Sequence, residues 1–270
     1  MARQGQKAGV RYAKVAVAFT AAAVTWVSAV HGQGSPVLSP VPKACETPGA
    51  QVIADSPLPN IAAALRERKK ITILAIGSTS ASLRGPVSGG HYAIVERFLE
   101  STFKGLDVVI VHRGVSGELA ADAGARIKTE VALADPDLVL WQLGTADVIA
   151  QVPVADFYVA VSETVAWLKE HKIDVILVGL RYVRSLARDL HYQAIRAAID
   201  DIAKKQMVLR IGRYAAEETL EKLRREQGSL MSDTEVTESS YVCMAEYLAR
   251  AIATGLFVKE QPPEVLPKQR

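Results

Sequence analysis

The sequence predicts a single α/β domain in which a parallel sheet of five strands lies between two layers of helices. Short apolar runs alternate with segments of helical spacing from about residue 60 to residue 255. The apolar runs are continuous rather than alternating, as in strands that are buried on both faces. Strands that alternate with helices at this spacing form a parallel sheet covered on both sides. No internal repeat and no second domain is evident.

Each element follows from its local pattern of apolar and polar residues. The expected strands cover residues 71–76, 108–111, 138–143, 175–178 and 207–211, the last with the weakest pattern. The expected helices cover residues 61–68, 92–103, 117–134, 154–172, 189–205, 215–227 and 237–254. In the helices apolar residues recur every three or four positions, as one buried face requires.

The N-terminus has the pattern of a secretory signal peptide. Residues 1–32 carry four basic residues and no acidic residue, and a mostly apolar run covers 15–30. Small residues follow the run, as at a cleavage site. An uncleaved membrane anchor is the alternative, but the run is shorter than the roughly 20 residues of a spanning helix. We therefore expect an exported domain, periplasmic or secreted, with membrane attachment only through an uncleaved leader.

After the leader, the sequence divides into three segments. We expect a Pro-rich arm over residues 33–60, the α/β domain over 61–256 and a C-terminal tail over 257–270. The formal net charge of +3 becomes −1 once the four basic residues of the leader are removed. A net charge of −1 gives no excess of basic residues for binding a nucleic acid, so we expect no nucleic-acid partner. We expect no cofactor.

The chain contains two cysteines, Cys45 and Cys243. In an oxidising compartment a disulfide between them is the favoured interpretation, and two buried thiols are the alternative. Closing a loop of this length contributes roughly 3–5 kcal/mol in the chain-entropy model. Two cysteines so far apart, without a histidine cluster, do not form a zinc site, and we expect no metal.

Ligands of such sheets bind beyond the carboxyl ends of the strands, so the segments after the strands are the ones to inspect. Three of them read Gly-Ser-Thr-Ser-Ala-Ser from Gly77, Arg-Gly-Val-Ser-Gly-Glu from Arg113 and Gly-Thr-Ala-Asp from Gly144. A fourth, Ser-Asp-Thr-Glu-Val-Thr from Ser232, leads into the last helix.

The order of these segments resembles the SGNH/GDSL hydrolase superfamily over roughly residues 60–255. It is most similar to a bacterial exported branch whose first motif reads Gly-Ser-Ser-Ser-Thr. The segments that fit this branch best are 113–118, 138–145 and 240–243. The resemblance implies a flavodoxin-like sheet and acyl transfer from esters by a serine, a histidine and an aspartate.

At most of the family's catalytic positions, this sequence has a different residue from the one that the family uses. The nucleophile position falls on Thr79, between Ser78 and Ser80, either of which a shift of one residue would offer. The histidine position falls on Glu235 and the aspartate position on Ser232. A glutamate with an ordinary pKa of about 4.3 is a poor base for activating a hydroxyl.

The oxyanion site is also altered. The family's glycine donor falls on Gly114 or Gly117, and its backbone N–H would survive. The family's asparagine donor falls on Ala146, which has no side-chain donor, and the neighbouring carboxylate of Asp147 would repel an oxyanion.

Cationic residues form a second feature of the expected ligand side. Arg181, Tyr182 and Arg184 follow the fourth strand and, with Arg113, would give the cleft a positive rim. Such a rim would recognise a carboxylate or an acidic sugar. The alternative is a solvated loop, or a pair between Arg113 and Glu118.

Three functions remain open from the sequence. The first is a catalytically impaired SGNH-like protein that binds an acylated or acidic glycan of the cell envelope. The second is an active esterase that uses Thr79 or a neighbouring serine. The third is a structural accessory subunit, which a large exposed apolar patch would favour.

Overall fold

The computed structural model describes residues 56–77, 90–226 and 233–256, without the side chains of residues 90–91, 223–224 and 233–241. Its sheet has five parallel strands in the order β2-β1-β3-β4-β5. The strands are β1 (Lys70–Gly77), β2 (Asp107–Gly114), β3 (Leu138–Gln142), β4 (Asp174–Val178) and β5 (Leu209–Ile211). This confirms the predicted parallel sheet and its flavodoxin-like order.

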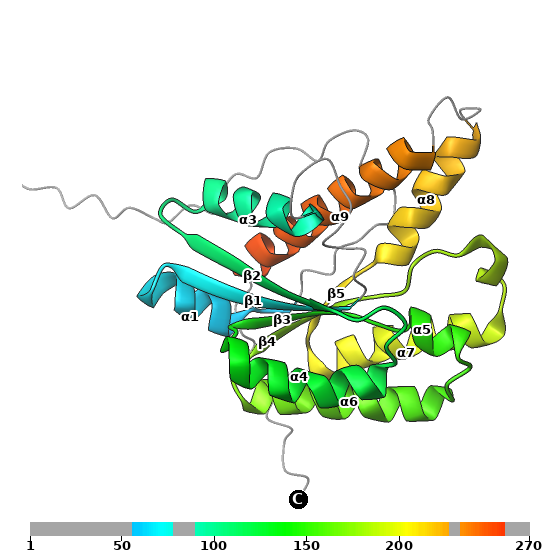
Figure 1. Cartoon of the computed structure of the whole chain (residues 1–270), viewed down its shortest axis with the longest axis horizontal. Coiled ribbons are helices and arrows are strands. Elements are labelled where there is room, and N and C mark those ends of the chain that lie inside the picture. The colour runs from blue at the N-terminus through cyan, green and yellow to red at the C-terminus, as the bar shows by residue number, and fades with distance from the viewer. Residues whose placement is uncertain (1–55, 78–89, 227–232, 257–270) are drawn as a thin grey trace, which may run out of the picture. The chain divides into compact units, whose positions relative to one another are not determined.

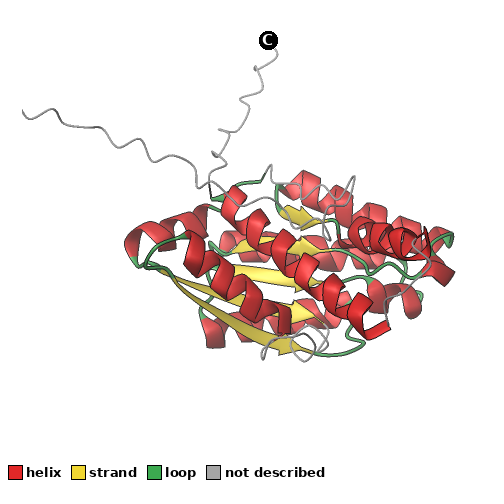
Figure 2. Cartoon of the chain, turned by 90° about the horizontal axis from the view of Figure 1, so that it is seen from above, coloured by secondary structure: helices red, strands yellow, loops and turns green. Residues whose placement is uncertain are grey.

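Helices cover both faces of the sheet (Figure 1). One layer contains α1 (Pro59–Glu67), α3 (Gly90–Thr102), α8 (Arg213–Glu226) and α9 (Asp233–Gly255). The other contains α4 (Ala120–Ala134), α6 (Val154–Glu170) and α7 (Leu190–Gln206). Figure 2 shows the strands between the two layers. The three-layer α/β/α arrangement is therefore confirmed, and each predicted helix is present with ends that differ by a few residues.

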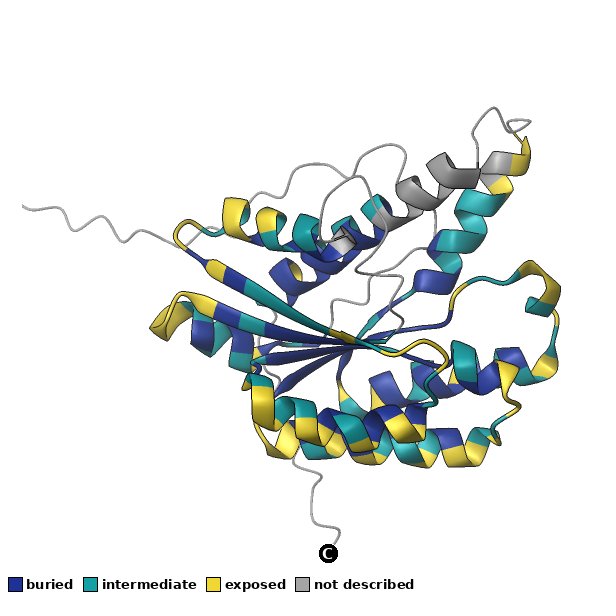
Figure 3. Ribbon diagram, viewed as in Figure 1, coloured by how far each residue is buried: buried dark blue, intermediate teal, exposed yellow. Residues whose placement is uncertain are grey.

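The strands contribute to two hydrophobic cores, one on each face. In β1, Ile71 and Ile73 lie in the core beneath α3 and α9, while Leu74 and Ile76 lie in the core beneath α4 and α6. All four side chains are buried. Figure 3 shows that the buried residues, in dark blue, gather in the strands and on the helix faces beside them. Burial on both faces explains why the sequence of this strand is continuously apolar.

Two short elements were not predicted. They are the helix α5 (Thr145–Ile149), directly after β3, and a 3₁₀ helix (Arg184–Leu186) after β4. The chain enters α5 through Gly144, whose φ of +94° lies in the left-handed region that favours glycine. A helix of five residues is too short to show a 3.6-residue period, so the pattern in the sequence did not reveal it.

The amino-terminal edge of the sheet is tied to α1 by a buried carboxylate. Asp174, at the start of β4, accepts hydrogen bonds from the backbone N–H groups of Asn60 and Ile61 and from the Asn60 side-chain amide, at 2.8–3.0 Å. Because the N-cap of α1, Leu58, forms no side-chain cap, Asp174 satisfies its first donors from another element. Burial raises the pKa of the Asp174 carboxyl to about 6.

Within the described ranges, no helix combines the length and apolarity needed to cross a bilayer. Residues 1–32, which the sequence assigns to a signal peptide, lie outside those ranges, as does Cys45. Cys243 is buried in α9. Its predicted bridge to Cys45 therefore stays a prediction.

Candidate ligand pocket

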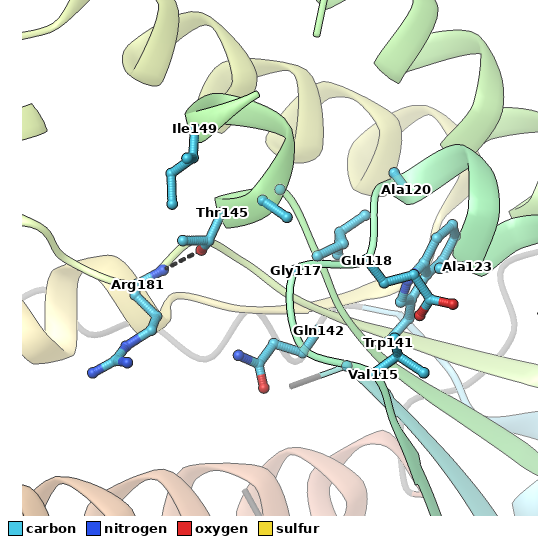
Figure 4. Close-up of a pocket in the computed structure, with 14 residues that line it drawn as sticks. Val115, Gly117, Glu118, Ala120, Ala123, Trp141, Gln142, Thr145, Ile149 and Arg181 are labelled. Atoms are coloured by element: carbon cyan, nitrogen blue, oxygen red, sulfur yellow. Dashed lines mark hydrogen bonds between the residues drawn. The ribbon is translucent and has the colours of Figure 1, made fainter. Parts of the chain in front are cut away.

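A cavity of about 200 Å³ lies where β1 and β3 end (Figure 4). Its walls come from the end of β1, the loop after β2, the start of α4, the end of β3, α5 and the loop after β4. The lining residues are Gly77, Val115, Gly117, Glu118, Ala120, Ala123, Trp141, Gln142, Leu143, Gly144, Thr145, Ala146, Ile149 and Arg181. This is the edge of the sheet at which a parallel α/β fold places its ligand.

The structure brings two of the predicted site residues to this pocket. Gly117 and Ala146 both line it, whereas Gly114 ends β2 and is not among the lining residues. Gly117 has a φ of +77°, and no atom lies within 4 Å of where its Cβ would be. Its N–H makes no hydrogen bond within the described chain.

The other expected catalytic positions cannot be compared with the pocket. Ser78, Thr79, Ser80 and Ser232 lie outside the described residues. The backbone of Glu235 belongs to α9, but its side chain is outside the description. The roles expected for these residues therefore remain predictions.

Asp147 is directed away from the cavity, although its neighbour Ala146 lines it. The Asp147 side chain is buried, and its Oδ1 accepts a hydrogen bond of 2.9 Å from the N–H of Ala120, the first residue of α4. Burial raises the pKa of this carboxyl. Because Leu119, the N-cap of α4, makes no side-chain cap, Asp147 holds the start of α4 against α5.

Glu118 is the acidic residue among the pocket-lining residues, and its charge is compensated. Arg126 of α4 donates to both carboxylate oxygens of Glu118, each at 2.6 Å. Arg113 instead donates to Glu130 of α4 at 3.1 Å. The pair between Arg113 and Glu118 that the sequence suggested is therefore wrong, because Arg126 occupies both carboxylate oxygens of Glu118.

Of the expected positive rim, Arg181 lines the pocket. The Arg181 side chain is 51% exposed, and its N–H donates to Thr145 Oγ1 at 3.3 Å. Arg184 pairs with Glu221 of α8, and the ring of Tyr182 packs edge-on against Tyr214. These contacts hold Arg184 and Tyr182 against α8.

Gln142 is a pocket residue that the sequence analysis missed. It is the last residue of β3, and its side chain extends into the cavity (Figure 4). Gly77 makes room for it, because a Cβ at position 77 would lie 2.7 Å from the Cβ of Gln142. The signal in the sequence was a polar amide at the end of an otherwise apolar run.

The described residues contain no cluster of histidine, cysteine and carboxylate side chains that could hold a metal ion. Chemically, the arrangement can bind a small polar group against an apolar wall.

The fold and the position of the pocket define an esterase-like hydrolase fold. The chain belongs to the Non-GDSL lipase-like family, whose model matches residues 44–257. This family is related to the SGNH/GDSL hydrolases that the sequence resembles. A comparison with curated proteins finds no match.

Solved structures share the fold at low identity. An acetylxylan esterase from Geobacillus stearothermophilus is 20% identical, with a TM-score of 0.56, over 67% of this chain and 94% of that one. An alpha/beta hydrolase enzyme from the metagenome of Lake Arreo, Spain, is 18% identical, with a TM-score of 0.56, over 70% and 97%. Catalytic mutants of the acetylxylan esterase replace a serine, an aspartate and a histidine.

Proposed function

We propose that this exported protein uses an esterase-type pocket to bind an acylated or acidic glycan of the cell envelope, and that its hydrolytic chemistry is impaired. The observation that carries the proposal is Ala146. Ala146 lines the pocket, and the motif order assigns the asparagine donor of the resembled superfamily to this position. This supports the proposal, because an alanine has no side-chain donor for an oxyanion.

The cost of these substitutions to hydrolysis is large. Removing one oxyanion donor lowers the rate of acyl transfer by about 10²–10³ in other enzymes. In this chain the positions of the base and of the residue that orients it also fall on Glu235 and Ser232. A carboxylate with a pKa near 4.3 removes a hydroxyl proton far less readily than an imidazole does.

The pocket itself supports a binding role. Apolar side chains from three elements, Val115, Trp141 and Ile149, stand beside the hydrogen-bonding groups of Gln142 and Arg181. A mostly apolar wall with a few fixed polar groups is the usual composition of small-molecule sites. Large exposed apolar side chains of the described residues are spread over several elements, so they do not favour the accessory-subunit hypothesis.

The test is hydrolysis of short-chain p-nitrophenyl esters by the purified protein, beside Thr79→Ala and Glu235→Gln. Arg184→Gln is the matched control, because Arg184 pairs with Glu221 away from the pocket lining. We expect no turnover above background, or equal traces in all four proteins. Turnover that is lost in Thr79→Ala and Glu235→Gln but kept in Arg184→Gln would contradict the proposal and identify an active esterase.

A further inference from the structure

Three side chains of the pocket carry hydrogen-bond donors. Gln142 lies at the end of β3, Thr145 at the start of α5 and Arg181 in the loop after β4. Figure 4 shows the side chains of Gln142 and Arg181 extending to the same side of the β3 end, with Thr145 above them. Three separate elements therefore bring donors to one space.

Each of these donors is available to a ligand. The Gln142 amide makes no hydrogen bond within the described chain. Thr145 Oγ1 accepts from the N–H of Arg181, which leaves its own hydroxyl hydrogen to donate. Within the described chain, the guanidinium of Arg181 comes near one carboxylate, that of Glu217. The distance from Arg181 Nε to Glu217 Oε1 is 4.0 Å.

Glu217 does not neutralise Arg181, because other donors already occupy it. Arg213 Nε donates to its Oε1 at 2.9 Å, and the N–H of Tyr182 donates to its Oε2 at 2.7 Å. The Arg213 and Glu217 side chains are only 8% and 12% exposed, so this shorter pair is the stronger one. Two guanidinium groups thus share one carboxylate, and Arg181 contributes a surplus positive charge to the pocket.

The opposite wall does not cancel this charge. Glu118 is held by both carboxylate oxygens to Arg126, so its negative charge is matched on its own side of the pocket. Among the described lining residues, the pocket therefore combines one uncompensated cation with neutral donors. A ligand group that suits it is an anion with several acceptor oxygens.

We propose that Arg181, Gln142 and Thr145 form a subsite for the carboxylate of a uronic-acid-type sugar. This inference rests on the proposed binding function and names the ligand class. A carboxylate is planar and presents two oxygens, which match the fork of an arginine guanidinium. The amide of Gln142 and the hydroxyl of Thr145 supply neutral donors beside it.

The backbone of Arg181 is held on both sides, which makes the subsite partly preorganised. Its N–H is bound to Thr145, and its carbonyl accepts a hydrogen bond from the hydroxyl of Tyr192. Tyr192 is fully buried in the core beneath α7. Less backbone freedom is then lost on binding, which favours affinity.

The experiment compares the binding of methyl β-D-glucuronide and methyl β-D-glucoside to the full chain by calorimetry. The two probes differ by a carboxylate in place of a hydroxymethyl group. We expect the wild type to bind the glucuronide at least about tenfold more tightly, as a charge-assisted pair provides. Arg181→Gln should remove this preference, and Gln142→Leu should reduce it. Arg184→Gln, which changes an exposed arginine three residues from Arg181, should keep it.

Equal affinity of the wild type for both probes would overturn the inference, as would equal losses in Arg181→Gln and Arg184→Gln. Competition by inorganic phosphate as strong as that by the glucuronide would overturn the carboxylate assignment. A second readout is the NMR signal of the Gln142 side-chain amide, assigned by its loss in Gln142→Leu, which should shift with glucuronide. Saturable binding of both probes with equal affinity would refute the subsite alone, whereas ester turnover lost in Thr79→Ala would refute the impaired function alone.

Discussion

The contact between α4 and α6 depends on a glycine, and an alanine there tests the packing beside the pocket. An added Cβ at Gly124 would overlap Oγ1 of Thr164 on α6. That hydroxyl donates to the carbonyl of Ala160 at 2.8 Å, so it does not turn away without losing a hydrogen bond. Overpacking of this kind costs about 1–3 kcal/mol, and the higher helix propensity of alanine returns about 1 kcal/mol. Gly124→Ala should therefore lower the free energy of unfolding by up to about 2 kcal/mol.

The sign of this effect should reverse when the hydroxyl is removed. In Thr164→Ala the nearest remaining atom of that residue is its Cβ, 3.5 Å from the new Cβ, which is an ordinary contact. Gly124→Ala should then stabilise the protein by up to about 1 kcal/mol through helix propensity alone. The coupling energy between the two substitutions should thus equal the overpacking cost, about 1–3 kcal/mol.

Urea unfolding of the wild type, the two single variants and the double variant, followed by circular dichroism, gives the four free energies of unfolding from which the coupling energy is calculated. An equal effect of Gly124→Ala in both backgrounds would refute the reasoning, because it would mean that α4 and α6 do not meet at this position. The result bears on the pocket as well. Ala120 and Ala123 of the same helix form part of its wall.

The remaining predictions concern charge and the covalent framework. Because burial raises the folded pKa of Asp174 to about 6, from an ordinary 3.8, its contribution to stability is present below about pH 4 and is lost as the pH rises through 6. Relative to Asp174→Asn, the free energy of unfolding should fall by roughly 3 kcal/mol between pH 4 and 7, and parallel pH profiles would contradict this. Arg126→Gln should cost about 1–3 kcal/mol in urea unfolding, because it leaves the half-buried Glu118 without its partner, and Arg126→Lys should cost less. Non-reducing mass analysis of the protein, produced in an oxidising compartment, should find Cys45 joined to Cys243, and two free thiols would refute the bridge.

The sheet was predictable from the sequence because burial on both faces makes each strand a continuous apolar run. In β1 and β3 every apolar side chain faces one core or the other, so composition alone marks the strands. The order of the strands was implied by the resemblance to the SGNH/GDSL hydrolases and not by the runs themselves. Neither α5 nor the 3₁₀ helix after β4 has enough residues to produce a periodic pattern.

The site was predictable only in part. Motif order placed Gly117 and Ala146, and both line the pocket. The direction of the Asp147 side chain and the partner of Glu118 depend on where α4 lies, and α4 is positioned by tertiary packing that no local pattern encodes. Gln142 was missed because its neighbours in the strand marked it as core.

Two features of the pocket, Ala146 and Arg181, bear on whether it would bind a stable anion or stabilise a transition state. An oxyanion site of an esterase stabilises a charge that develops only in the transition state, and it usually does so with fixed backbone N–H groups and amide side chains. A full positive charge beside the reacting group would bind a carboxylate already present, including the acid that hydrolysis releases, and would slow turnover. Under the proposed function, the missing neutral donor at Ala146 and the surplus cation at Arg181 would both favour a stable anion over the transition state. A pocket that binds an acidic sugar is the outcome that both features favour, and the glucuronide comparison tests it directly.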